Sequence, residues 1–190
     1  MTTVDALHVA SLRRWSSSSD STAAVAELSM ESMTANQLSE ALAANVSRVR
    51  NCSMLIVRLG AVDRPTLLAT WATAQAAKFP IRICLAVDRS TLATIGPNLP
   101  ADERVGLLLD GVDDTTPPVD VVNEAIEAIR FDSRFVAKAT RHLRSECVLD
   151  ALLTLAKNAG LATLGPESRS TGGSWLSPHV DFDYVAEDVV

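Results

Sequence analysis

The sequence predicts an α/β domain in which helices cover a parallel β-sheet. Short apolar runs of strand length recur from residue 54 onward, and helical stretches separate them. These runs are almost continuously apolar, as in strands that are buried on both faces. Alternation of such strands with helices is typical of parallel sheets. The pattern leaves two closures open, a β/α barrel and an open doubly wound sheet.

The first 53 residues carry a weaker pattern. A run of four serines, Ser16 to Ser19, predicts a flexible connection or the approach to a helix N-terminus. Residues 23–50 contain neither glycine nor proline, and apolar residues recur there at helical spacing. We therefore expect a helix that ends near Asn51.

The remaining elements follow from apolar runs, prolines and glycines. Proline suits the first turn of a helix, and glycine suits its C-terminal end. Strands are predicted at 54–59, 81–87, 105–109, 128–131, 161–164 and 183–185. Helices are predicted at 65–78, 119–127 and 133–158, the last with a break near Ser145, with at most a short helix in 91–100 and a last helix after Gly173.

Composition excludes several classes of protein. The chain has 190 residues, of which 47% are hydrophobic, so it is neither disordered nor a disulfide-stabilised mini-protein. A net charge of −6 argues against a general nucleic-acid partner. Cys52, Cys84 and Cys147 form no CxxC pair, which excludes a zinc knuckle, and Cys84 lies in an apolar run that predicts burial. Neither a signal peptide nor an apolar stretch of membrane-spanning length is present, so we expect a cytoplasmic protein without membrane contact.

Three carboxylates follow predicted strands directly. Asp88, Asp110 and Asp132 each stand where a strand ends. In a β/α barrel the C-terminal strand ends carry the active site. An aspartate at this position also caps the helix that follows, so capping is the alternative role. No strand is followed by GxGxxG or GxxxxGKS/T, which argues against a nucleotide-binding open sheet.

The second half of the chain resembles the EAL domains of bacteria, which are β/α barrels that hydrolyse cyclic di-GMP. Residues 128–160 are similar to the stretch that runs from "KIDRSFV" to "LAKELGL". Further pieces follow in order: 10–15 (ASLRRW) at "EALLRW", 57–60 at "VNLS", 83–91 at "LELEITESA", 107–113 at "LALDDFG", 161–169 at "LKVIAEGVE" and 182–188 at "CDYVQGY".

The resemblance implies one degenerate domain over residues 1–190, with residues 1–53 weakly matched. The stretches around the serine run and between residues 87 and 105 are short for this family. We therefore expect a shortened or incomplete EAL-type β/α barrel, similar to a TIM barrel.

The resemblance also predicts loss of catalysis. The family's metal ligands fall on Ala10, Arg58, Ala86 and Gly111 here, and a glutamate of "AEGVE" falls on Pro166, with Glu167 one position away. Asp110 and Asp132 are retained, which is too few oxygen ligands for a two-metal site. We expect no catalytic residue, no metal and no cofactor, and we expect Asp110 and Asp132 to cap helices or to pair with Arg58 and Arg130.

Three functional hypotheses follow from the resemblance. The first is a non-catalytic regulator in bacterial signalling that acts through protein–protein contacts. The second is a receptor that binds cyclic di-GMP without cutting it; Arg14 stands at the phosphate-binding arginine of the family, and Asp110 and Asp132 would line the same site. The third is a weak metal-dependent phosphodiesterase.

Two surfaces are candidates for partner contact. Arg134, Lys138 and Arg141 have the i, i+4, i+7 spacing of one helical face, which is either a solvated face or a docking stripe. Trp175 follows two glycines and is either packed or an anchor for a partner. Missing helical cover would leave apolar strand surface open, so we expect a homodimer or a complex with another protein.

Overall fold

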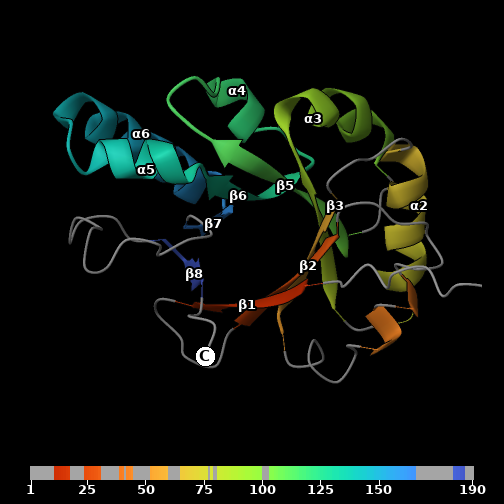
Figure 1. Ribbon diagram of the computed structural model, residues 1–190. Coiled ribbons are helices and arrows are strands. Elements are labelled where there is room, and N and C mark those ends of the chain that lie inside the picture. The colour runs from red at the N-terminus through yellow and green to blue at the C-terminus, as the bar shows by residue number, and fades with distance from the viewer. Residues whose placement is uncertain are drawn as a thin grey trace, which may run out of the picture.

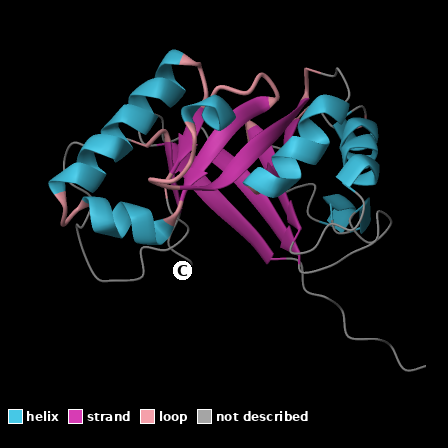
Figure 2. Ribbon diagram, turned by 90° about the horizontal axis from the view of Figure 1, so that it is seen from above, coloured by secondary structure: helices cyan, strands magenta, loops and turns pink. Residues whose placement is uncertain are grey.

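Eight strands close into a barrel. Of the two arrangements that the sequence left open, the structure therefore has the β/α barrel and not the open doubly wound sheet. The computed structural model describes residues 11–17, 24–30, 39–40, 42–44, 52–59, 65–76, 78, 81–99, 103–165 and 182–186. Within these residues the strands follow one another around the ring in chain order, and the last pairs with the first. Figure 2 shows the strands in the middle with helices at two sides of them. The α/β barrel predicted from strand–helix alternation is confirmed.

Seven of the eight strands run in one direction. From β2 to β8 every neighbouring pair is parallel, whereas β1 is antiparallel to both β2 and β8. The ring therefore closes through a strand of opposite direction (Figure 1). The strands are β1 Ser11–Ser17, β2 Ala24–Met30, β3 Met54–Leu59, β4 Arg82–Val87, β5 Val105–Val112, β6 Ile126–Phe131, β7 Ala162–Leu164 and β8 Tyr184–Ala186.

The helical cover is short, as predicted, although the ring of strands is complete. Helix α3 and the 3-10 turn η1 fill the stretch in which at most a short helix was expected. The helices are α2 Pro65–Ala76, α3 Arg89–Ile95, η1 Gly96–Asn98, α4 Pro118–Val121, α5 Ser133–Ala139 and α6 Leu143–Asn158, with further helical residues at 39–40 and 42–44.

The long helix predicted over residues 23–50 is wrong in its first part. Residues 24–30 form β2, and Val25 to Leu28 are all buried. A strand between β1 and β3 has both faces covered, so it shows no alternation of polar and apolar residues. Its alanine and glutamate content therefore indicated a helix, and tertiary pairing overrode that local preference.

Two further boundaries differ from prediction. Helix α4 ends at Val121, and β6 begins at Ile126, so the predicted helix over 119–127 is wrong beyond its first turn. The break in the 133–158 helix falls at residues 140–142 and not near Ser145. This earlier turn lets the apolar faces of α5 and α6 each pack on the core, as their buried residues show. The last helix predicted after Gly173 lies outside the described residues.

Apolar side chains form two separate layers. Along β3, Leu55 and Val57 belong to the layer between strands and helices, which also contains the buried Trp71. Met54 and Ile56 alternate with them and belong to a second cluster inside the ring. This inner cluster is completed by Val25, Cys84, Leu108, Ala128 and Leu164. The interior is thus packed with side chains, and its polar layer forms the site described next.

Candidate functional site

A buried guanidinium holds two carboxylates together inside the barrel. Arg130 on β6 is 1% exposed, and Glu27 on β2 is equally buried. Nη1 of Arg130 donates to both oxygens of Glu27, at 2.8 and 2.9 Å. Its Nε and Nη2 donate to the two oxygens of Asp110 at 2.8 and 2.7 Å. All four carboxylate oxygens therefore accept hydrogen bonds from one arginine.

Arg58 adds a second cation on the more open side of this cluster. Its Nη2 lies 3.2 Å from Oδ2 of Asp110, and the two side chains are 39% and 19% exposed. The strand ends predicted to carry the site thus do converge, since Arg58 is near the end of β3 and Asp110 near the end of β5. Among the described residues the cluster contains two carboxylates and two guanidiniums.

The pKa values follow from this pairing. Burial alone would raise the pKa of Asp110, but the hydrogen bonds and charge of Arg130, with the charge of Arg58, lower it below its usual range. Burial alone would lower the pKa of Arg130, but its bonds to Asp110 and the charges of Glu27 and Asp110 raise it. Both groups are therefore held in their charged forms.

Ring position explains why Arg130 and Glu27 meet. Strands β2 and β6 are separated by three strands in either direction around the ring. Their side chains therefore contact each other only across the interior. Val25 on β2 and Ala128 on β6 precede this pair by two residues and belong to the inner cluster, which places the ion pair in the next layer of the same interior.

Glu27 was missed by the sequence analysis. The match of ASLRRW to "EALLRW" put the position of the family's glutamate at Ala10, yet residues 11–15 lie on the antiparallel strand β1. The interior glutamate comes from Ala26-Glu27-Leu28 on the next strand, β2. A lone charged residue within an apolar, glycine-free stretch was the available signal. The side chain of Arg14, which lies on β1, is outside the described side chains.

Asp132 does not join the cluster but caps a helix. Its Oδ1 accepts hydrogen bonds from the backbone N–H groups of Arg134 and Phe135 at the start of α5. Asp88 does the same for α3, where Thr91 N donates to its Oδ1 at 2.7 Å and lowers its pKa. Capping is therefore confirmed for these two of the three strand-end aspartates, and pairing with Arg58 and Arg130 for Asp110.

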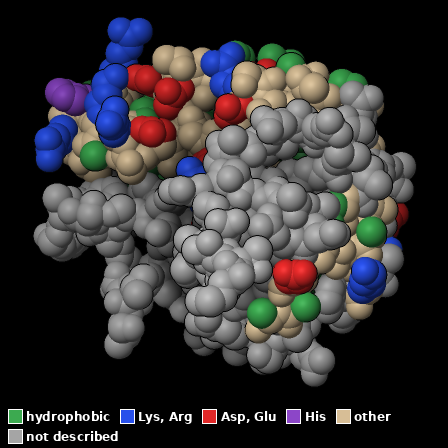
Figure 3. All heavy atoms as spheres, turned by 45° about the vertical axis from the view of Figure 1, so that its right-hand side comes forward, with side chains coloured by type: hydrophobic (Ala, Val, Ile, Leu, Met, Phe, Trp, Pro, Cys, Tyr) green, Lys and Arg blue, Asp and Glu red, His purple; other side chains and the backbone are tan. Residues whose placement is uncertain are grey.

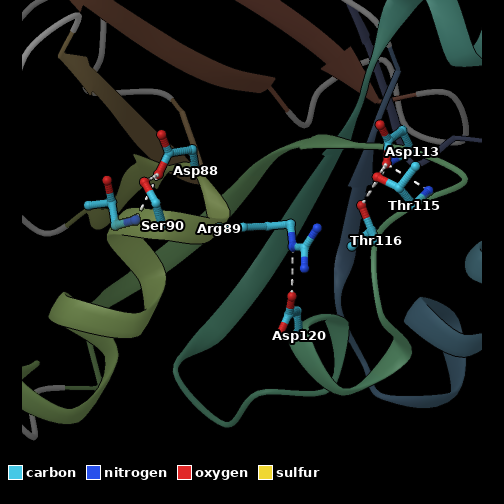
Figure 4. A network of polar contacts seen from close by, with 8 residues as sticks. Asp88, Arg89, Ser90, Asp113, Thr115, Thr116 and Asp120 are labelled. Atoms are coloured by element: carbon cyan, nitrogen blue, oxygen red, sulfur yellow. Dashed lines mark hydrogen bonds and ion pairs between the residues drawn. The ribbon is translucent and has the colours of Figure 1, made fainter.

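The loops above the strand ends are tied to one another by polar contacts. Arg89 pairs with Asp120 at 2.9 Å, which links the start of α3 to α4. Asp113 accepts hydrogen bonds from Thr115 and Thr116, and this local turn holds the pKa of Asp113 low despite partial burial. Figure 4 shows Arg89 pointing toward Asp120, and Asp113 with Thr115 and Thr116 beside this pair. These contacts fix the rim of the barrel near the cluster.

A second polar group lies inside the ring near the strand starts. Glu127 on β6 pairs with Arg82 at 2.9 Å and accepts from the Cys84 thiol at 3.8 Å. A Cβ on Gly106 would lie 2.3 Å from Cδ of Glu127, so the Glu127 side chain would have to shift to accommodate any other residue there. Burial, followed by the neighbouring Glu127 charge, raises the pKa of Cys84, so this thiol stays protonated. The prediction that Cys84 is a buried apolar residue is confirmed.

The predicted basic stripe is only partly one helical face. Arg134 and Lys138 are exposed on α5, and Lys138 pairs with Asp114 at 2.6 Å. Arg141 lies past the end of α5, in the turn before α6, so the i, i+4, i+7 assignment is wrong for it. Trp175, Pro166 and Glu167 lie outside the described residues.

The described residues include no group of three or more histidine, cysteine, aspartate or glutamate side chains placed to hold a metal ion. Glu27 and Asp110 are the two carboxylates of the interior cluster, and guanidinium groups occupy their oxygens. Divalent metals need several oxygens that converge on one point. Among the described helices, none has the length and apolar character that crossing a membrane requires.

Comparison with known proteins shows which solved structures share this architecture. No protein-family model and no curated protein matches the sequence. The FimX EAL domain superposes with a TM-score of 0.64 at 13% identity, over 93% of this chain and 86% of that one. The Xanthomonas citri FimX EAL domain in complex with c-di-GMP superposes with a TM-score of 0.62 at 12% sequence identity, and the match covers 94% of this chain and 84% of that one. The PaMucR phosphodiesterase in its c-di-GMP complex superposes with a TM-score of 0.58 at 11% sequence identity, and the match covers 94% of this chain and 88% of that one.

These likenesses agree with the order of strands and helices derived above, and they extend over nearly the whole described chain. At such low sequence identity these likenesses establish the fold alone. Any function has to be argued from the residues of this chain. The chain therefore has the fold of an EAL domain, as a β/α barrel with shortened helices.

Proposed function

We propose that this chain is a non-catalytic regulatory protein that works through protein–protein contacts in bacterial cyclic di-GMP signalling, in the cytoplasm. The observation that supports this most is the double engagement of Arg130. Its guanidinium donates hydrogen bonds to all four oxygens of Glu27 and Asp110, the two carboxylates of the described cluster near the strand ends. A phosphodiesterase of the metal type needs such carboxylates free to hold cations and to generate hydroxide.

Electrostatics opposes a metal in the same place. A divalent cation at Asp110 would stand within a few ångströms of Arg58 and Arg130, and repulsion between such charges is strong where water is excluded. Displacing Arg130 would in turn take the hydrogen bonds to Glu27 and Asp110 from a buried guanidinium, which costs several kcal/mol by order of magnitude. Metal binding would therefore have to dismantle the cluster.

A hydrolysis assay tests the proposal directly. The purified chain is incubated with cyclic di-GMP and Mg²⁺ or Mn²⁺, and the linear dinucleotide is quantified against a blank. We expect no product. Product that appears above the blank and disappears in Asp110→Ala would contradict the proposal, while product that persists in Asp110→Ala identifies a contaminating activity.

A receptor role is the second candidate, and the exposure of Arg58 favours it. This guanidinium is 39% exposed at the end of β3, where an anionic ligand can reach it. Calorimetric titration with cyclic di-GMP, without and with Mg²⁺, separates the candidates: a receptor binds without metal, and an interaction module does not bind. If binding occurs, Arg14→Ala or Arg58→Ala should weaken it by about 1–3 kcal/mol. An unchanged affinity in both variants would place the ligand elsewhere.

A further inference from the structure

The side of α6 that is turned away from the core carries no charge along its centre. Residues three and four positions apart lie on one face of a helix. Five exposed residues of α6 share a face by this spacing: Leu143, Cys147, Ala151, Thr154 and Asn158. The buried residues of α6 lie on the opposite side: Ser145, Leu149, Leu152 and Ala156. We call the five exposed residues the α6 ridge, which at 1.5 Å per residue is about 22 Å long.

An uncharged ridge is unusual at the most exposed positions of a helix. A surface helix normally presents charged and polar side chains there. The charged residues of α6 instead flank the ridge, with Arg144 on one side and Asp150 and Lys157 on the other. At the start of the ridge, Leu143 is 75% exposed, more than any other large hydrophobic side chain among the described residues. The small side chains of Cys147 and Ala151 would let a second helix approach closely.

The start of the α6 ridge is also basic. Arg141 and Arg144 stand on either side of Leu143 in the sequence, and both are exposed. Within the described part of the chain neither guanidinium has an ion-pair partner, although the protein has 23 acidic and 17 basic residues. Other arginines do pair with carboxylates: Arg58, Arg82, Arg89 and Arg130. Figure 3 shows basic side chains and a histidine gathered at one corner of the molecule.

We propose that the α6 ridge binds an amphipathic helix of a partner protein, with acidic residues of that helix at Arg141 and Arg144. The apolar face of such a helix would cover the ridge, with Leu143 as the anchor. Its carboxylates would give the two guanidiniums the charge-assisted hydrogen bonds that this chain does not supply. The inference rests on the proposed function, because it names the kind of partner through which a regulatory protein would act.

A second copy of the chain does not provide these carboxylates. Laid antiparallel, its α6 would bring residues 154–160 to the two arginines, and that stretch contains Lys157 and no carboxylate. Laid parallel, it would gather four guanidiniums at one end of the pair, where like charges repel.

A polyanion also fits less well than an acidic helix. DNA or an anionic membrane would gain contacts from Arg141 and Arg144 but nothing from the uncharged remainder of the ridge. Residues 111–125 carry four carboxylates and no lysine or arginine, and the ion pair of Asp114 with Lys138 ties this stretch to α5. An extended negative surface would meet these charges as well, and they would repel it.

Selection from a displayed library of amphipathic helices tests the proposal on the native chain. Each peptide has about four turns, an apolar face and random residues elsewhere. We expect the recovered peptides to carry aspartate or glutamate at one end. Their affinity, measured by fluorescence anisotropy, should fall at least about tenfold in Arg141→Ala with Arg144→Ala, and equally in Ala151→Glu, which places a charge on the ridge.

Arg134→Ala is the matched control. Arg134 is a further exposed arginine, at the start of α5, whose guanidinium has no ion-pair partner in the described part of the chain. Its loss should leave the affinity unchanged, which separates the ridge from a general attraction between basic protein and acidic peptide. Glutamate is a good helix former, so Ala151→Glu should keep the native circular dichroism spectrum.

Several outcomes would overturn the proposal: no recovered peptide, recovered peptides without acidic ends, or an affinity that both ridge variants leave unchanged. Duplex DNA or anionic vesicles that bind the native chain more tightly than the peptides, in a manner that needs Arg141 and Arg144, would assign the surface to a polyanion instead. Hydrolysis of cyclic di-GMP would remove the proposed function whatever the peptides do. Absence of peptide binding in a chain that hydrolyses nothing would remove this inference alone.

Discussion

Arg130 and Glu27 are 103 residues apart in the sequence and form an ion pair across the interior of the barrel, in which Nη1 of Arg130 lies 2.8 and 2.9 Å from the two oxygens of Glu27. The pair joins strands that are opposite each other in the ring. Because Arg130 also binds both oxygens of Asp110, this single side chain connects three of the eight strands. Stability, acid sensitivity and metal response should all depend on it.

Replacing Arg130 with methionine should lower the free energy of unfolding by about 3–5 kcal/mol, because Glu27 and Asp110 then lose the guanidinium that binds all four of their oxygens. Urea denaturation at neutral pH measures the change. Arg89→Met is the matched control: Arg89 also pairs with an aspartate, but at 48% exposure, so its loss should cost less than about 1 kcal/mol. Equal losses in the two variants would show that the interior pair contributes no more than a surface pair.

Arg130→Lys separates charge from geometry. Lysine keeps the positive charge but cannot give parallel hydrogen bonds to two carboxylates. We expect a stability between those of the native chain and Arg130→Met, measured by the same denaturation. A lysine variant as stable as the native chain would mean that charge alone holds the cluster.

Acid should weaken the fold through Asp110. Its pKa is lowered from 3.8 in the folded protein, so the unfolded chain takes up this proton at a higher pH than the folded chain does. The stabilisation is therefore complete above about pH 5 and is lost as pH falls through the lower folded value. Urea midpoints between about pH 7 and pH 2.5 should fall less steeply in Asp110→Asn. The exposed Asp150→Asn is the control and should keep the native slope.

Asp132 should behave as a helix cap and not as a ligand-binding carboxylate. Asp132→Ala should lower stability by about 0.5–2 kcal/mol, because the N–H groups of Arg134 and Phe135 lose their acceptor. Asp132→Asn should lose much less, since asparagine caps nearly as well. Thermal unfolding measures both. If the two variants lost the same stability, the negative charge would matter more than the capping bonds.

Divalent cations should distinguish the native chain from Arg130→Gln. In the native chain Glu27 and Asp110 already hold a guanidinium, so about 1 mM Mn²⁺ should leave the melting temperature unchanged. In Arg130→Gln the two carboxylates lose that cation, and Mn²⁺ should raise the melting temperature by binding the folded state. The comparison uses thermal unfolding with and without EDTA. The same shift in both proteins would show that the metal binds elsewhere.

The predictable part of this molecule was the part with local signals. The apolar runs predicted β3, β4 and β5. The aspartates that precede helical stretches predicted the helix caps at Asp88 and Asp132. Strand β2 was missed because Val25 to Leu28 are buried on both faces, and AVAELSM then has the composition of a helix. The partnership of Glu27 with Arg130 depends on ring closure, which no local pattern encodes.

Pairing of β1 with β8 has a consequence for synthesis on the ribosome. Residues 11–17 are made early, but their partner strand, residues 184–186, emerges only after some 167 further residues. At about 5–20 residues per second that interval is roughly 10–30 s, during which one edge of the nascent sheet has no neighbour. An open edge of this kind can pair with another nascent chain. Slow translation of the second half of the gene should therefore increase aggregation, and a chaperone that shields early strands should relieve it.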